Sequence, residues 1–154
     1  MKHKTEGRSR NVKSAPRSSR KKSEKNELTL WDQASRWYDS LVGSQGTDFQ
    51  KDIIMPGVLR LLDVAKKDRV LDLACGQGVF SRYLSQKGIN VEGLDSSAEL
   101  LKYARTRSGS SIRYHVGDAA DAKKFKEDTF DAIACLMAIQ NIERMDLLFK
   151  SACR

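Results

Sequence analysis

Cysteine and histidine are scarce in this sequence, and long hydrophobic runs are missing. The 154 residues include three cysteines that lie far apart, Cys75, Cys135 and Cys153, and two histidines, His3 and His115. No Cys-x-x-Cys pair or Cys/His cluster occurs, which argues against a disulfide framework or a zinc site and favours a reducing compartment such as the cytoplasm. No apolar run approaches the length of a membrane span, and the first residues lack the hydrophobic core of a signal peptide, so we expect no membrane contact.

Acidic residues are nearly missing from the first 25 positions. Ten of the 28 Lys and Arg residues but only two of the 20 Asp and Glu residues fall there, so the rest of the chain holds 18 of each sign and is neutral. Residues 1–25 are predicted to be a disordered basic tail, and residues 26–154 one folded domain. The tail suits a nucleic-acid or anionic-surface tether, an organelle presequence or a solvated extension without specific role. It has no aromatic residue to stack on bases, which favours the last.

From residue 69 onward, short apolar runs alternate with amphipathic stretches, which is typical of a doubly wound parallel α/β sheet. The predicted elements are strands at 69–74, 89–94, 111–116 and 130–139, and helices at 79–87, 96–106 and 142–149. The strand at 130–139 is almost entirely apolar and is expected to be buried on both faces. In strand 111–116, Ile112, Tyr114 and Val116 are expected to point inward. Ser96 and Glu99 are predicted to form a capping box.

Two further helices are predicted upstream of the first strand, at residues 28–42 and 48–65. Pro56-Gly57 should kink or split the second helix. Both helices are expected to cover the mouth of a site at the sheet edge.

Three polar motifs follow successive predicted strands. The stretch VLDLACGQG at 70–78 ends in a Gly-x-Gly turn, Asp95 follows the second strand, and Gly117-Asp118-Ala119 follows the third. Glycine lets the backbone approach a ligand, Asp95 can accept both hydroxyls of a ribose, and Asp118 can accept from an amine such as that of adenine. Asp72, inside the first strand, repels a pyrophosphate and suits a cationic ligand. Asp95 as a helix-capping residue and Asp118 as a simple turn residue are the structural alternatives.

The segments VLDLACGQG, GLDSS, GDA and FDAIACLMAIQNI together resemble class I S-adenosylmethionine-dependent methyltransferases, particularly their small-molecule-type domains, over about residues 30–150. The resemblance implies a Rossmann-like seven-stranded sheet, of which this chain holds the first four strands, and in-line methyl transfer from S-adenosylmethionine to a small-molecule acceptor. It implies that the cofactor is bound by Tyr38, Asp72, Ala74, Cys75, Gly76, Gly78, Asp95, Ser96, Asp118, Ala119 and Leu136.

The resemblance also implies a role for several of these residues. Asp72 would hold the amino group of the cofactor, and Asp95 the ribose. Leu136 and Met137 would line the methyl-transfer side, and Tyr38 would close over the cofactor.

The sequence also departs from patterns of the family. Residues 136–141 lack the Asn/Asp-Pro-Pro-Tyr/Phe segment common among enzymes that methylate base or amide nitrogens, and no catalytic residue is evident. The family continues for three strands beyond the fourth, so we expect this chain to be a fragment with an open sheet edge. Two other functions remain open. One is an NAD-type oxidoreductase, although the third glycine of its fingerprint would fall at Ser81. The other is a non-catalytic fragment that binds nucleic acid through residues 1–25.

Overall fold

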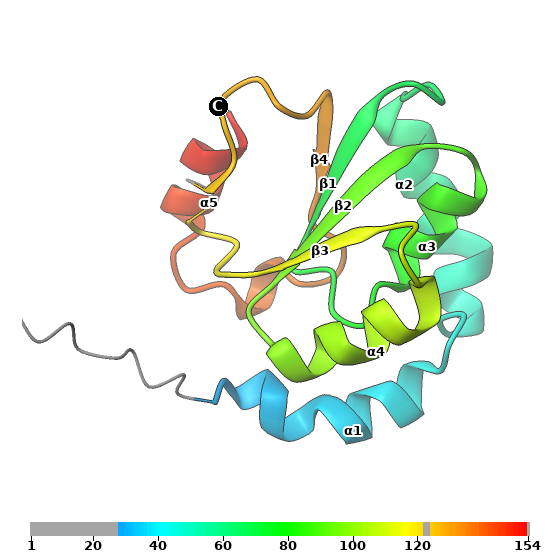
Figure 1. Ribbon diagram of the computed structural model, residues 1–154, viewed down its shortest axis with the longest axis vertical. Coiled ribbons are helices and arrows are strands. Elements are labelled where there is room, and N and C mark those ends of the chain that lie inside the picture. Colours follow the sequence, from blue (N-terminus) through cyan, green and yellow to red (C-terminus); the bar gives the residue numbers. More distant parts are fainter. Residues whose placement is uncertain (1–27, 122–123, 154) are drawn as a thin grey trace, which may run out of the picture.

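The computed structural model describes residues 28–121 and 124–153 (Figure 1). The basic segment 1–25 lies outside the described residues, so its predicted disorder and its suggested contact with nucleic acid stay predictions. In the described part of the chain, no helix is both long and apolar enough to cross a membrane.

Four parallel strands form a single sheet in the order β3-β2-β1-β4, as the alternating pattern predicts. The strands are β1 Arg69–Leu73, β2 Asn90–Asp95, β3 Arg113–Val116 and β4 Ala132–Ala134. In the register, Val70 of β1 lies beside Val91 of β2 on one side and Ala132 of β4 on the other. The central position of β1 brings the carboxyl ends of its two neighbours next to the glycine turn that follows it.

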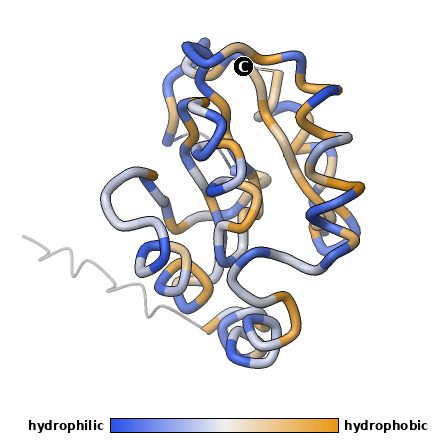
Figure 2. The backbone as a smooth tube through the Cα atoms, turned by 90° about the vertical axis from the view of Figure 1, so that its right-hand side faces the viewer, coloured by the Kyte–Doolittle hydropathy of each residue, from blue (hydrophilic) through white to orange (hydrophobic). Residues whose placement is uncertain are grey.

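Helices cover both faces of this sheet (Figure 1). One face carries α2 Met55–Leu62, α3 Val79–Gln86 and α4 Ala98–Ser108, and the other carries α5 Met145–Ala152. Successive residues of a strand point to opposite faces, so Val70 packs in the cluster under α3 while Leu71 packs in the cluster with Leu148 of α5. Along the helices, hydrophobic and hydrophilic residues alternate, so one side of each can face the sheet (Figure 2). The prediction of a doubly wound α/β fold is confirmed.

The upstream helices also form, with differences at their ends. Helix α1 spans Leu30–Val42 and begins at a capping box in which Thr29 and Asp32 bond each other's backbone N–H groups. The second predicted helix is divided just before Pro56-Gly57, into a π-helix, Gln50–Ile54, and α2, which follows it directly and contains both residues. The N–H of Met55 bonds the carbonyl of Gln50, and the next residue, Pro56, has no N–H to continue that pattern.

The prediction for the fourth strand is wrong in length and burial. Only Ala132–Ala134 pair with β1, and Ala132 and Ile133 are half-buried rather than buried. Met137 adopts a left-handed φ of 55°, and a 3₁₀ turn follows at Ile139–Asn141. Because a strand cannot continue through this backbone conformation, the second half of the apolar run leaves the sheet. The next helix, α5, therefore starts later than predicted.

The inward alternation predicted for the third strand fails at its end. Ile112 and Tyr114 are buried, but the Val116 side chain is 47% exposed. β3 is the last strand on its side of the sheet and ends at Val116, so fewer neighbours cover this residue.

Candidate cofactor site

The turn between β1 and α3 holds three residues in left-handed conformation, Ala74, Gly76 and Gly78. A Cβ atom at Gly76 would meet only the Tyr38 ring, at 3.7 Å, so this glycine faces open space. A Cβ atom at Gly78 would instead lie 3.0 Å from the Tyr114 ring and 3.1 Å from Ala104, and would collide with the Tyr114 hydroxyl. The two glycines of the motif therefore have different roles. Gly76 leaves space beside the turn, and Gly78 allows Ala104 of α4 and Tyr114 of β3 to pack against the turn.

Asp95 ends β2 and is oriented by the same turn. Its Oδ2 accepts the N–H of Gly76 at 2.7 Å, and its Oδ1 accepts the N–H of Ser97 at 2.8 Å. Burial raises the pKa of this carboxyl, although the two N–H donors act in the opposite direction. A carboxylate oxygen has two acceptor positions, so each oxygen can accept a further hydrogen bond from a ligand.

The predicted capping box at Ser96 and Glu99 does not form. The N-cap of α4 is Ser97, whose hydroxyl accepts the N–H of Leu100, and the Glu99 side chain pairs with Lys102. The N–H of Glu99 donates to Asp32 of α1, so a carboxylate from a different helix supplies the second capping contact. Ser96 is thereby free of the helix cap.

A cavity of about 610 Å³ opens at the carboxyl edge of the sheet, against the glycine turn. This is the edge at which open α/β sheets bind ligands, and the volume suits a small molecule. Eight of the eleven predicted cofactor residues line it: Tyr38, Ala74, Gly76, Asp95, Ser96, Asp118, Ala119 and Leu136. The structure thus brings together residues from five segments, the first and last of which lie almost one hundred positions apart in the sequence.

The three other predicted residues, Asp72, Cys75 and Gly78, do not line the cavity. The Asp72 side chain is 1% exposed and lies under α3, where it accepts a hydrogen bond of 2.6 Å from the Ser81 hydroxyl. Burial raises the pKa of Asp72 to about 7. Cys75 packs closely against Gly93: a Cβ atom added to Gly93 would lie 2.8 Å from the Cys75 sulfur. Burial raises the pKa of the Cys75 thiol well above its ordinary value, which disfavours the nucleophilic thiolate.

The far wall of the cavity comes from segments after β3 and β4. Asp118 Oδ1 accepts the N–H of Ala120 at 2.8 Å, which fixes this loop. Leu136 and Met137 supply apolar surface, and the amide nitrogen of Gln50 lies 4.0 Å from the Met137 sulfur. Sequence reasoning missed a further set of lining residues: Trp31, Leu41, Val42, Thr47, Gln50, Leu100, Ala120, Ala138 and 140–144. The sequence indicated part of this set only indirectly, through the expectation that the predicted helices at 28–42 and 48–65 cover the site.

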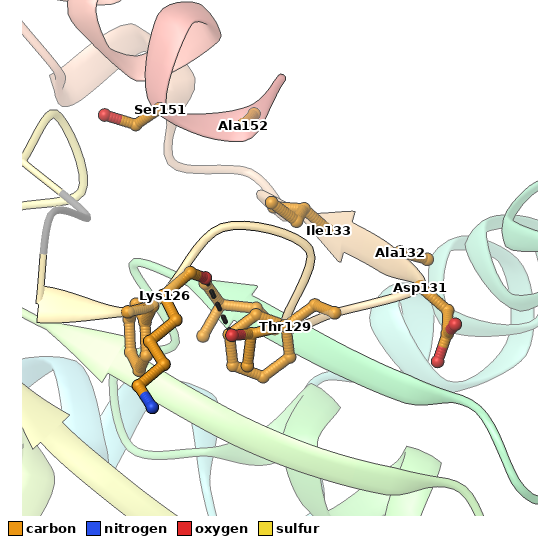
Figure 3. Close-up of a pocket in the computed structure, with 10 residues that line it drawn as sticks. Lys126, Thr129, Asp131, Ala132, Ile133, Ser151 and Ala152 are labelled. Atoms are coloured by element: carbon orange, nitrogen blue, oxygen red, sulfur yellow. Dashed lines mark hydrogen bonds between the residues drawn. The ribbon is translucent and has the colours of Figure 1, made fainter. Parts of the chain in front are cut away.

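Two other places carry side chains of chemical interest. His115 lies outside the cavity, with Nε2 2.7 Å from Glu92 and its ring edge-on to Phe125. A second hollow of about 310 Å³ lies between β4 and α5 and is lined by Lys126, Thr129 and Ile133 among others (Figure 3). Because it flanks the amino end of β4 rather than the carboxyl edge, it lacks Asp95, Asp118 and the glycine turn. Among the described residues, no three His, Cys, Asp or Glu side chains are grouped to hold a metal ion.

Residues 70–154 match a protein family described as methyltransferase domain. Among curated proteins, the ubiquinone biosynthesis O-methyltransferase of Hydrogenovibrio crunogenus is 25% identical over 126 residues, which cover 79% of this chain and 52% of that protein. The chain spans about half the length of the curated relatives it matches.

Two solved structures share the fold. The PH0226 protein of Pyrococcus horikoshii is 29% identical with a TM-score of 0.63, covering 78% of this chain and 55% of that one. Phosphoethanolamine N-methyltransferase 2 of Haemonchus contortus, solved with S-adenosyl-L-methionine, is 25% identical with a TM-score of 0.66, covering 78% and 29%.

Proposed function

The chain belongs to the methyltransferase domain family of class I S-adenosylmethionine-dependent enzymes. We propose that its cavity binds S-adenosylmethionine for methyl transfer to a small-molecule acceptor. The single observation that carries this proposal is the position of Asp95. Its carboxylate lines the cavity while backbone N–H groups of Gly76 and Ser97 hold both of its oxygens in place. A fixed acceptor at the end of the second strand is what the paired hydroxyls of a ribose require.

The residues around Asp95 fit the remaining parts of the cofactor. Asp118 and Ala119 line the cavity and offer a carboxylate and an apolar side chain to an aminopurine ring. Gly76 leaves space beside the turn, where backbone can approach the amino-acid part. Asp72 lies behind this turn. Its pKa of about 7 leaves it partly ionised at neutral pH, and that negative charge supports a cationic ligand over a pyrophosphate. Ser81 stands where a dinucleotide fingerprint needs its third glycine, and its hydroxyl is used by Asp72, so the oxidoreductase alternative has less support.

The cofactor, when bound, supplies a methyl group already activated on a sulfonium sulfur. The chain's contribution is to orient that group and to exclude water from it. Leu136 and Met137 contribute the apolar wall next to the remaining cavity space, where an acceptor would lie. Among the described residues no histidine or cysteine lines the cavity, so we assign no general base.

A reducing, cytoplasmic location is supported by three unpaired cysteines, Cys75, Cys135 and Cys153.

Calorimetric titration of the full chain with S-adenosylhomocysteine and, separately, with NAD tests this function. We expect saturable binding of S-adenosylhomocysteine only. Asp95→Asn should weaken it by about 10- to 100-fold, because the amide provides one acceptor oxygen where the carboxylate provides two. Asp121→Asn, at an exposed position near the third strand, serves as the matched control and should bind like the unchanged protein. Tighter binding of NAD, or no effect of Asp95→Asn, would refute the proposal.

A further inference from the structure

Helix α1 forms one wall of the cavity but has little apolar anchorage. It contributes Trp31, Tyr38, Leu41 and Val42 to the lining, yet its buried residues are only Ser35 and Val42. It lies alongside α4, away from the sheet (Figure 1). A helix with so little buried hydrophobic surface depends on polar contacts for its position.

The first polar contact is made by Asp32, at the amino end of α1. Its Oδ1 accepts from the Ser97 hydroxyl at 2.7 Å and from the N–H of Glu99 at 3.1 Å, while Oδ2 accepts from Thr29. Burial alone would raise the pKa of Asp32, but the hydrogen bonds from Glu99, Ser97 and Thr29 lower it to about 2. The carboxylate is therefore ionised at neutral pH and holds α1 against the start of α4.

The second polar contact is made by Asp39, two helical turns further along α1. Its two oxygens accept from the two terminal nitrogens of Arg107 at 2.6 and 2.8 Å, a bidentate pair that shields both partners from most of the solvent. Arg107 also donates to the side-chain oxygen of Gln77, and the amide nitrogen of Gln77 donates to the carbonyl of Gly43 at 3.1 Å. This network closes around the carboxyl end of α1.

Both polar contacts of α1 are connected by hydrogen bonds to residues at the cofactor site. Ser97 bonds Asp32 through its hydroxyl and Asp95 through its N–H, so one residue joins α1 to the ribose carboxylate. Gln77 lies in the glycine turn, between Gly76 and Gly78, and is 1% exposed. Tyr38 is placed between the two contacts, with its ring 5.5 Å from that of Trp31 and 3.7 Å from the Cβ position of Gly76.

We infer that Asp32 and Asp39 are positioning residues that fix helix α1 across the cofactor cavity, so that Tyr38 is held against the glycine turn. The inference rests on the proposed function for its ligand and on the two polar networks for its geometry. Neither carboxylate lines the cavity, so both act through α1 and not by contact with the cofactor.

The test compares Asp39→Asn, Asp32→Asn, Tyr38→Ala and the double variant Tyr38→Ala/Asp39→Asn in the full chain. We expect Asp39→Asn to weaken S-adenosylhomocysteine about 10-fold, mainly through faster dissociation, because a loose wall releases ligand more often. The double variant should be less than 2-fold weaker than Tyr38→Ala alone, since Asp39 acts through Tyr38. Asp48→Asn breaks an exposed pair with Lys51 upstream of α2 and is the control that should leave binding unchanged. Asp39→Glu, which keeps the charge, should recover part of the affinity.

Hydrogen exchange of the ligand-free proteins provides a second readout. The amides of residues 30–42 should exchange faster in Asp32→Asn and Asp39→Asn, while those of β1 and α3 keep their rates, which shows an intact fold. Unchanged exchange in α1, or losses in Tyr38→Ala and Asp39→Asn that multiply in the double variant, would overturn the inference. If the unchanged protein fails to bind S-adenosylhomocysteine, the proposed function fails, and the exchange rates still decide the role of the two carboxylates.

Discussion

Substitution of Asp72 by asparagine should make the protein more stable at neutral and alkaline pH. The carboxyl of Asp72 is buried on the α3 face of β1, and burial raises its pKa from 3.8 to about 7. A group with a raised pKa in the folded state contributes stability that is complete below pH about 4 and is lost as the pH rises through about 7. The full difference corresponds to about 4 kcal/mol of unfolding free energy, of which about 2 to 3 kcal/mol is lost between pH 5 and pH 8.

Asparagine has the shape of the protonated acid and stays neutral at every pH. It can still accept the hydrogen bond from the Ser81 hydroxyl, so the stabilising contact is kept while the charge is removed. We therefore expect the Asp72→Asn variant to lose less stability than the unchanged protein between pH 5 and pH 8. The same change removes negative charge behind the glycine turn, so affinity for a cationic cofactor should fall as stability rises.

Urea denaturation at pH 5 and pH 8, followed by circular dichroism, measures this difference. Asp32 has a pKa of about 2 and stays ionised in both buffers, so it does not contribute to the change. Asp95, whose pKa is also raised by burial, is retained in both proteins and leaves a common slope. Asp121→Asn, at an exposed position, should keep the pH dependence of the unchanged protein. Equal pH slopes for Asp72→Asn and the unchanged protein would refute the reasoning.

Two further predictions concern packing, and thermal denaturation checks both. Gly78→Ala should destabilise the protein by at least about 2 kcal/mol, because Gly78 has a φ of 75° and its added Cβ would meet Tyr114; Gly57→Ala, with open space around it, should cost nothing. Leu148→Ala, at a side chain 3% exposed on α5, should cost about 2 to 5 kcal/mol, whereas Leu61→Ala at an exposed position should be nearly neutral. A large loss in either control, or none in its partner, would contradict the packing described.

Local sequence patterns predicted much of the fold and many residues of the site. The strand, glycine turn and helix at 69–87 are encoded in adjacent residues, and so are the positions of Asp95 and Asp118 at the ends of their strands. Because parallel strands align their carboxyl ends, order along the chain was enough to bring these motifs to one edge. The placement of Asp72 was harder to predict, since the alternation of a strand decides which face a residue points to, and here it points under α3.

Features that depend on distant partners left no local signal. The ion pair between Asp39 and Arg107 joins positions 68 residues apart. The cap of α4 falls on Ser97, and Asp32 from another helix accepts the next cap contact. The apolar run after Phe130 had the composition of a buried strand, but apolar side chains were also needed for the cavity wall, and periodicity cannot separate these uses.

The central place of β1 in the sheet has a consequence for the order in which the chain folds. Arg69 of β1 and Glu92 of β2 are 23 positions apart, while Arg69 and Asp131, which directly precedes β4, are 62 apart. Closing the longer loop costs about 1 kcal/mol more chain entropy. We therefore expect β1, β2 and β3 to associate first, with the turn and Asp95 already in place, and β4 to dock afterwards. The part of the cavity formed by the glycine turn and Asp95 would then assemble before the wall formed by Leu136 and Met137.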